Sequence, residues 1–122
     1  MKTQDSHSRK LLKPEVLKLI GHPVRMQILM ALARGEECVC HLTFMLGMRQ
    51  AYVSQQLAIL RRAGLVVDRK EGLNVYYQIA DPHIRELLHL LEKAVEVPNK
   101  VHHHGRIAGC PCPKCQIALV EA

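Results

Sequence analysis

The sequence predicts a mainly α-helical fold that carries one small β-hairpin. Several segments place apolar residues at helical spacing, whereas a single segment alternates and is rich in Val and Tyr. A glycine separates the third and fourth helical segments, which is typical of a helix-turn-helix. Two helices, a helix-turn-helix, a hairpin and a last helix, in that order, predict a winged helix-turn-helix with flanking helices at both ends.

The first two helices are predicted within residues 14–35. Pro14 suits the first turn of a helix, and Gly21 ends that helix. Pro23 opens the next helix, whose nearly continuous apolar residues predict a position in the core, and Gly35 ends it. Residues 1–13 are polar and basic, so we expect a flexible N-terminus there.

The helix-turn-helix is predicted in residues 37–64. The third helix is expected in "ECVCHLTFMLGM", with Leu42 facing the core, and Gly47 breaks the pattern. The fourth helix is expected in "RQAYVSQQLAILRRAG", where Val53, Leu57 and Leu60 recur at helical spacing. The second helix of such a pair reads DNA in proteins of this architecture.

A hairpin and a last helix complete the predicted domain. The segment "LVVDRKEGLNVYYQI" alternates on both sides of Glu71-Gly72, which predicts two short strands. Asp81 is a plausible N-cap of the last helix, with Pro82 at its first position. We therefore expect a winged helix-turn-helix domain for DNA binding and dimerisation at 14–97, followed by a tail rich in Cys, His and Pro at 98–122.

Composition points to a polyanionic partner and a reducing compartment. The 122 residues carry a formal net charge of +6, which favours double-stranded DNA as a partner. Only three Tyr and one Phe occur, which argues against base stacking on aromatic platforms. No apolar run approaches the roughly 20 residues that span a membrane, and the start lacks the apolar core of a signal peptide. We expect a cytoplasmic protein that contacts no membrane.

Polar side chains near the start of the fourth helix are candidates for base contacts in the major groove. Three further basic residues suit contacts to the DNA backbone. The alternative is that these residues form only the solvated face of an amphipathic helix. The candidates for DNA binding are Arg49, Gln50, Tyr52, Ser54, Gln55, Gln56, Arg61, Arg69 and Lys70.

All five cysteines fall in two tight clusters, Cys38 with Cys40, and Cys110 with Cys112 and Cys115. On a helix, residues two apart are about 200° apart around the axis, so a shared ion requires a helix that begins near Cys38. Thiolates suit thiophilic ions such as Zn, Cd, Pb, Cu(I) and trivalent arsenic. A reversible thiol switch and inert cysteines are the alternatives. We expect His102–His104 to be solvated rather than ligating, and His41 to have a surface role.

The segments "LIGHPVRMQILMAL", "ECVCHL", "VSQQLAILRRAGLV" and "DRKEGLNVYYQI" resemble the ArsR/SmtB family of metal-sensing repressors. The resemblance covers about residues 14–96. The "CVC" at Cys38 and Cys40 is similar to the thiolate motif of the family's arsenic, antimony, cadmium and lead sensors. The resemblance implies a homodimer that binds operator DNA and leaves it when the inducer binds. It implies a dimer interface on the first and last helices, around Leu17, Ile20, Leu87, Leu88 and Leu91.

The chain departs from the family pattern in two places. Residues 1–37 hold no cysteine, whereas cadmium and lead sensors add thiols from that region; here the extra thiols lie at the C-terminus. Asp81 and His83 match half of the zinc site of other members, but Ala94 and Val97 at the remaining positions cannot ligate. Asp81 is therefore better interpreted as a helix cap.

The sequence thus predicts a repressor, not an enzyme, released from its operator when As(III), Sb(III), Cd, Pb or Zn binds the cysteines. The alternative is a redox- or persulfide-sensing repressor of the same fold. A thiol-disulfide oxidoreductase is disfavoured because the C-x-x-C at Cys112 and Cys115 follows no predicted strand. An interaction module whose tail carries structural zinc is a further alternative.

Overall fold

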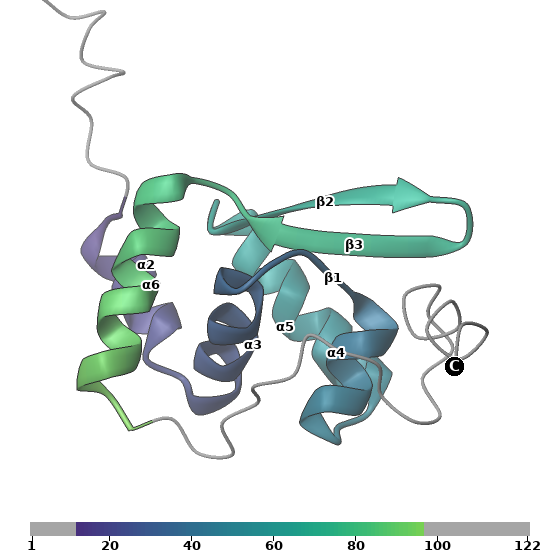
Figure 1. The fold of residues 1–122 in the computed structure, drawn as a ribbon, viewed down its shortest axis with the longest axis horizontal. Coiled ribbons are helices and arrows are strands. Elements are labelled where there is room, and N and C mark those ends of the chain that lie inside the picture. Colours follow the sequence, from purple (N-terminus) through teal and green to yellow (C-terminus); the bar gives the residue numbers. More distant parts are fainter. Residues whose placement is uncertain (1–11, 97–122) are drawn as a thin grey trace, which may run out of the picture.

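A computed structural model describes residues 12–96 of the chain. Its elements follow the predicted order (Figure 1), and a hairpin projects past the helix pair that precedes it. They are α2 (Pro14–Ile20), α3 (Pro23–Ala33), β1 (Glu37–Cys38), α4 (Val39–Leu46), α5 (Gln50–Arg62), β2 (Val66–Glu71), β3 (Asn74–Ile79) and α6 (Pro82–Ala94). The predicted winged helix-turn-helix is therefore confirmed. The flexible N-terminus and the tail at 98–122 stay predictions, because residues 1–11 and 97–122 lie outside the described residues.

The core is built around α3, which lies between α6 on one side and the α4–α5 pair on the other (Figure 1). Every residue from Gln27 to Ala33 is buried, which explains why its apolar residues are nearly continuous. Leu57 and Leu60 of α5 and Leu88 of α6 pack into the same core with no exposed surface. Fully burying one such side chain contributes about 1.5–3 kcal/mol, so this cluster fixes where α5 is held.

Local sequence signals set the ends of the helices. Pro stands at the first positions of α2, α3 and α6, where a missing N–H costs nothing. The Nδ1 atom of His22 accepts a hydrogen bond from the backbone N–H of Val24 at 3.2 Å, and the Asp81 carboxylate accepts one from that of His83 at 2.7 Å. Gly47 ends α4 in the left-handed region, with φ of 65°, and so makes the turn of the helix-turn-helix.

The sheet has a third strand that the sequence did not predict. The antiparallel order is β1-β3-β2, and β1 pairs Glu37 with Tyr77 and Cys38 with Tyr76. The prediction that Glu37 and Cys38 belong to the third helix is therefore wrong, because α4 begins at Val39. A strand of two residues is too short to show alternation, and it forms because β3 offers its free edge. This pairing fixes the segment that carries Cys38 and Cys40, called the thiol segment below, against the hairpin of β2 and β3, which is the wing of the fold.

The two helices of the implied dimer interface bury some of their apolar residues in the protomer and expose others. Ile20 and Leu88 are 4% and 0% exposed, so both belong to the core of the protomer. Leu17 on α2 and Leu90 on α6 are 50% and 59% exposed. Ile20 and Leu88 therefore add no exposed surface to the implied interface on the first and last helices, which stays an expectation, whereas Leu17 and Leu90 offer exposed apolar surface on the same two helices.

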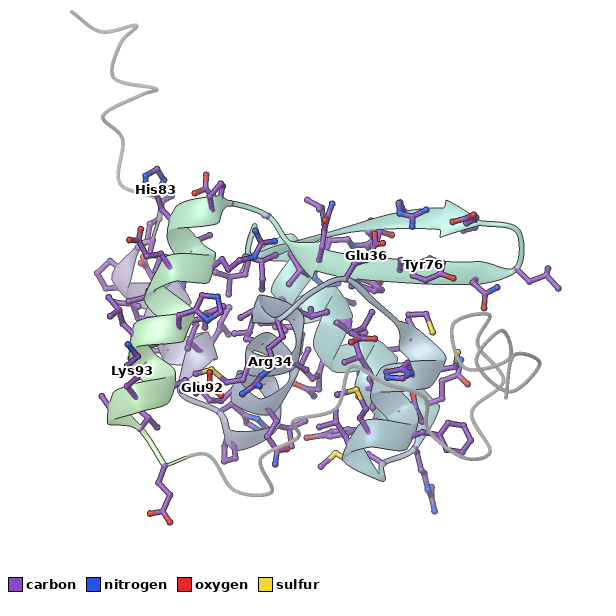
Figure 2. All side chains as sticks on the ribbon, viewed as in Figure 1. Arg34, Glu36, Tyr76, His83, Glu92 and Lys93 are labelled. Carbon is purple, nitrogen blue, oxygen red and sulfur yellow. The ribbon has the colours of Figure 1, made fainter. Side chains whose placement is uncertain are left out.

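An ion pair ties the end of α3 to α6. Figure 2 shows Arg34, which follows α3, beside Glu92 of α6, and their side chains are hydrogen bonded.

Within residues 12–96 no single helix is long and apolar enough to cross a membrane; α2 and α3 reach that length only as a pair bent by 91°.

Candidate functional site

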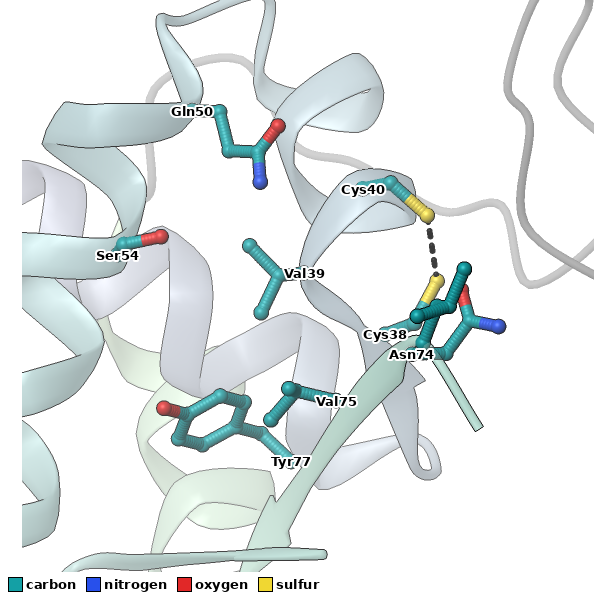
Figure 3. A pocket seen from close by; sticks show the side chains of 9 residues that line it. Cys38, Val39, Cys40, Gln50, Ser54, Asn74, Val75 and Tyr77 are labelled. Atoms are coloured by element: carbon teal, nitrogen blue, oxygen red, sulfur yellow. Dashed lines mark hydrogen bonds between the residues drawn. The ribbon is translucent and has the colours of Figure 1, made fainter. Parts of the chain in front are cut away.

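Cys38 and Cys40 lie together at the junction of β1 and α4. Their Sγ atoms are 3.0 Å apart (Figure 3). Cys38 is the N-cap of α4, with extended backbone at φ −86° and ψ 159°, and Cys40 lies in the first turn. Two residues that are two apart within a helix point about 200° away from each other around its axis. Because Cys38 precedes the helix, this separation does not apply, and the two thiols can lie together. The structure thus brings together the first of the two predicted clusters.

The surroundings of the thiols are mostly buried. Cys38 is 3% exposed, and its Sγ accepts a hydrogen bond from the backbone N–H of His41 at 3.4 Å. The Nε2 atom of His41 lies 3.6 Å from Oε1 of Glu37, and both side chains are fully buried. The predicted surface role for His41 is therefore wrong. Helical spacing within α4 did not reveal this, because the buried neighbour of His41, Glu37, belongs to strand β1.

The thiol pair fits part of the donor set of a thiophilic ion. A tetrahedral zinc ion with bonds of about 2.3 Å holds its sulfur ligands about 3.8 Å apart, so the two thiols need to separate by less than about 1 Å. Within residues 12–96 no group of three or more His, Cys, Asp or Glu side chains is arranged to hold a metal. Cys110, Cys112, Cys115 and His102–His104 lie outside the described residues. Cys38 and Cys40 thus offer two soft donors of the three or four that such ions take.

A cavity of about 230 Å³ adjoins the thiol pair (Figure 3). It lies between the start of α4, the start of α5 and the wing. Its lining residues are Cys38, Val39, Cys40, Gln50, Ser54, Leu73, Asn74, Val75 and Tyr77. Burial raises the pKa of the Tyr77 phenol, and the charge of Asp68 adds to this. Two predicted DNA-reading residues, Gln50 and Ser54, therefore share one cavity with the two thiols.

Helix α5 presents an exposed polar face over its first two turns. Gln50, Ser54 and Gln55 are exposed, as is Arg49, the N-cap residue. Tyr52 is half-buried. The opposite face of α5 packs into the core through its buried apolar residues. This arrangement has the polarity that a recognition helix needs, because a packed face orients the exposed one.

Gln56 does not belong to that exposed face. It is 6% exposed, and its Oε1 accepts a hydrogen bond from Nε of Arg25 at 2.8 Å. Arg25 also donates from Nη1 to the carbonyl of Leu19 at 3.1 Å, so it joins α5 to the end of α2. The prediction of a DNA-reading role for Gln56 is therefore wrong. Its spacing of three from Val53 already placed it on the core-facing side.

On the wing, Arg69 is held by carboxylates. Its Nε and Nη2 donate to the two carboxylate oxygens of Glu36 at 2.7 and 2.9 Å, and Nη1 donates to Glu71 at 2.8 Å. Its guanidinium also stacks over the ring of Tyr76, 4.7 Å from the centroid. The hydrogen bond from Arg69 lowers the pKa of Glu36, and the two carboxylates raise the pKa of Arg69.

The remaining basic candidates of α5 and the wing are exposed. Lys70 lies within β2, before the turn of the hairpin, which is formed around Gly72 with φ of 63°. Arg61 and Arg62 end α5, and Nη1 of Arg61 lies 3.5 Å from Asp68. Lys70 and Arg62 therefore present the more accessible charge, whereas Arg69 is paired on two sides.

The chain is similar to known DNA-binding regulators. Residues 22–67 match the model of the family described as bacterial regulatory protein, arsR family. A transcriptional repressor SmtB homolog of Synechocystis is 42% identical over 73 residues, which cover 60% of this chain and 55% of that protein. The arsenic resistance transcriptional regulator ArsR1 of Pseudomonas putida is 35% identical over 96 residues, covering 77% of this chain and 74% of that protein.

A solved structure agrees with these relatives. The homodimeric winged helix-turn-helix DNA-binding domain of Mb0332 from Mycobacterium bovis superposes with a TM-score of 0.62 at 32% identity, covering 85% of this chain and 91% of that one. Its title describes it as a possible ArsR-family transcriptional regulator. These similarities confirm a DNA-binding regulator rather than an enzyme. The chain therefore belongs to the ArsR family of bacterial regulatory proteins.

Proposed function

We propose that this chain is a repressor that binds operator DNA as a homodimer and is released when a thiophilic metal or metalloid ion binds its cysteines. The observation that carries the proposal is the 3.0 Å separation of the Cys38 and Cys40 sulfurs at the start of α4. Helix α4 leads directly through the turn at Gly47 into α5. A change at the thiol pair therefore acts on the helix next to the one that reads DNA.

The DNA-binding part of the proposal rests on α5. Two α5 helices of a dimer enter successive major grooves about 34 Å apart. Arg49, Gln50, Tyr52, Ser54 and Gln55 approach base edges and nearby phosphates, because they lie on the side of α5 that faces away from the core. Lys70 and Arg61 approach the DNA backbone. Arg69 contacts DNA only where its pairs with Glu36 and Glu71 open.

The sensing part joins Cys38 and Cys40 to at least one thiol among Cys110, Cys112 and Cys115. The inducer is As(III), Sb(III), Cd, Pb or Zn, all of which thiolates bind well. Binding moves the Cys38 and Cys40 sulfurs apart by less than about 1 Å, shifts the first turn of α4 relative to β1, and so disfavours the spacing of α5 that fits DNA. A tenfold to hundredfold loss of operator affinity requires a coupling of only about 1.4–2.8 kcal/mol. Metal–thiolate bonding supplies several times that amount.

Replacement of both Cys38 and Cys40 with Ser tests the proposal. We expect the variant to bind upstream operator DNA as the unaltered chain does, and to remain bound when arsenite, Cd or Pb is added. Fluorescence anisotropy of labelled operator measures both quantities, and circular dichroism checks the fold. Unchanged release by all three ions would exclude Cys38 and Cys40 as sensing ligands. Single Ser replacements of Cys110, Cys112 and Cys115 identify the ligand supplied by the tail.

The same sulfur separation favours one second function, a thiol-based redox sensor. A disulfide bond is about 2.05 Å long, so the sulfurs need to approach by about 1 Å to form one. Formation removes two electrons and two protons from Cys38 and Cys40 and requires an external oxidant such as a peroxide. Mass spectrometry separates the two functions, because oxidation removes two hydrogens from the chain whereas the metal sensor binds its ion in a fixed stoichiometry.

A further inference from the structure

The side chain of Arg25 joins three helices. Arg25 lies in the first turn of α3 and is half-buried. Its Nε donates a hydrogen bond to Oε1 of Gln56 on α5 at 2.8 Å, and its Nη1 donates one to the backbone carbonyl of Leu19 on α2 at 3.1 Å. The planar fork of a guanidinium donates in fixed directions, so the two bonds hold their acceptors in a defined relation to each other. One side chain of α3 therefore ties α2 to α5.

The bond to Leu19 braces a sharp corner. Helices α2 and α3 meet at an angle of 91°, with Gly21 and His22 between them. The carbonyl of Leu19 belongs to the last turn of α2, where carbonyls lack a partner within their own helix. Arg25 supplies a partner from six residues further along the chain, so the bond spans the corner and stabilises its angle.

Helices α2 and α5 face each other across an open groove. The volume of the groove is about 430 Å³. Its lining residues are Glu15, Val16, Leu19, Ile59, Arg62 and Ala63. Because the side chains of these two helices do not fill the space between them, packing at this place does not define their separation. The bond from Arg25 to Gln56, which is only 6% exposed, supplies a fixed connection instead.

We propose that Arg25 is a positioning residue that fixes the separation of the two DNA half-sites that the dimer accepts. This inference rests on the proposed binding of operator DNA by a homodimer. Helix α2 is one of the two helices of the expected dimer interface, so the partner copy holds it in place. Helix α5 presents Gln55 to DNA, next to the buried Gln56. The connection through Arg25 thus sets where each α5 lies relative to the interface.

A rigid connection makes the dimer selective for one spacing of the half-sites. One added base pair moves the second half-site by about 3.4 Å along the DNA axis and turns it by about 35° around that axis. A dimer whose α5 helices are held relative to α2 cannot follow this displacement without breaking contacts. A dimer without the Arg25 bonds follows it more easily and therefore discriminates less between spacings.

Arg25→Lys tests the proposal in the full-length chain, because it keeps the positive charge and loses the fork that bonds both acceptors. Footprinting of the DNA upstream of the gene defines the half-sites. Synthetic duplexes then carry them at the natural spacing or with one base pair added or removed. We expect the unaltered chain to prefer the natural spacing by about tenfold, and Arg25→Lys to lower this preference by about threefold or more. Fluorescence anisotropy without added ions measures each affinity.

Matched variants separate positioning from a general loss of stability. The preference is a ratio of two affinities of the same variant, so a smaller folded fraction cancels from it. Ile28→Val removes a buried methyl group from the same helix and takes part in neither bond, so it is expected to lower the melting temperature and keep the preference. Gln56→Glu retains an oxygen acceptor for Arg25 and is also expected to keep the preference. Gln56→Ala breaks the bond from its other end and replaces Arg25→Lys where that variant does not fold.

The outcomes distinguish this inference from the proposed function. An Arg25→Lys variant that keeps the full preference, or an Ile28→Val variant that loses it equally, would overturn the inference; the proposed function stands if ions still release DNA through Cys38 and Cys40. Relaxed spacing in Arg25→Lys alone supports the inference, even where ion release proves independent of Cys38 and Cys40 and the sensing part of the proposed function fails. An unaltered chain that binds all spacings equally overturns both the inference and the proposed binding of two half-sites by a dimer.

Discussion

Arg69 of β2 holds both carboxylate oxygens of Glu36, at 2.7 and 2.9 Å, across the middle strand of the sheet. Tyr76 on β3 pairs with Arg69 on one side and with Cys38 on the other. Glu36 stands two residues before Cys38, so the ion pair closes a second connection between the thiol segment and the wing. This connection lies outside the core and depends on charge.

The first prediction concerns the stability of this connection in acid. The pKa of Glu36 is lowered in the folded chain, so the pair stabilises the fold above the unfolded-state pKa of Glu36. That contribution is lost as the pH falls through the lower, folded-state pKa. We expect Glu36→Gln to reduce the free energy of unfolding by about 0.5 kcal/mol at pH 7, and by progressively less as the pH falls below the unfolded-state pKa.

Urea unfolding across this pH range, followed by circular dichroism, measures the effect. Glu86→Gln, which removes an exposed carboxylate of α6, is the matched control. If the difference in free energy of unfolding between Glu36→Gln and the unaltered chain stays constant down to pH 3, the ion pair between Glu36 and Arg69 does not stabilise the fold as described.

The second prediction separates the two basic residues of the wing. Lys70→Ala is expected to weaken operator binding and to reduce the slope of log affinity against log salt by about 1, because one phosphate contact is lost. Arg69→Ala is expected to change that slope by much less, because Glu36 and Glu71 already neutralise Arg69. Anisotropy titrations at several salt concentrations give both slopes. Equal slope changes for the two variants argue against a paired Arg69 in the DNA complex.

The third prediction concerns adjacent glutamines on α5. Gln55 is exposed, so Gln55→Ala is expected to lower operator affinity by about 1–3 kcal/mol and to leave the fold unchanged. Gln56 is buried and accepts a hydrogen bond from half-buried Arg25, so Gln56→Ala is expected to cost about 1 kcal/mol of folding stability, because this hydrogen bond is lost. Thermal melting and DNA titration of both variants check this. The idea fails if Gln56→Ala alters base preference while melting normally.

The fourth prediction places the dimer interface. Leu90→Asp on α6 is expected to weaken self-association at least tenfold, because it puts a charge in place of an apolar side chain that is 59% exposed. Leu73→Asp is the control, since Leu73 is also exposed but lies at the end of the wing. Analytical ultracentrifugation over a range of concentrations gives the dimer affinity. A Leu90→Asp variant that dimerises normally places the interface elsewhere.

Most of the fold was predictable from the sequence, because its signals are local. Proline at Pro14, Pro23 and Pro82 and glycine at Gly47 mark helix ends through backbone geometry alone. The spacing of Val53, Leu57 and Leu60 likewise reflects the packed face of α5.

The features that were not predictable depend on contacts distant in the chain. Strand β1 forms only because β3, almost 40 residues further on, presents an edge to Glu37 and Cys38. His41, for which we expected a surface role, is fully buried beside Glu37 of the same strand. The hydrogen bond between Arg25 and Gln56 joins residues that are 31 apart in the sequence, so no local pattern predicts it. The pairing of Cys38 with Cys40 was predictable, because the two residues are close in the sequence. The cavity beside them was not, because residues of the wing form part of its lining.

Cys38 ends β1 and caps α4, so a single residue belongs to two elements at once. One residue inserted on its helix side turns the whole of α4 by about 100° relative to the sheet. One inserted on its strand side moves every β1 side chain to the opposite face. The length of this junction is thus fixed by geometry, because an added residue on either side of Cys38 breaks its alignment with the sheet or with α4.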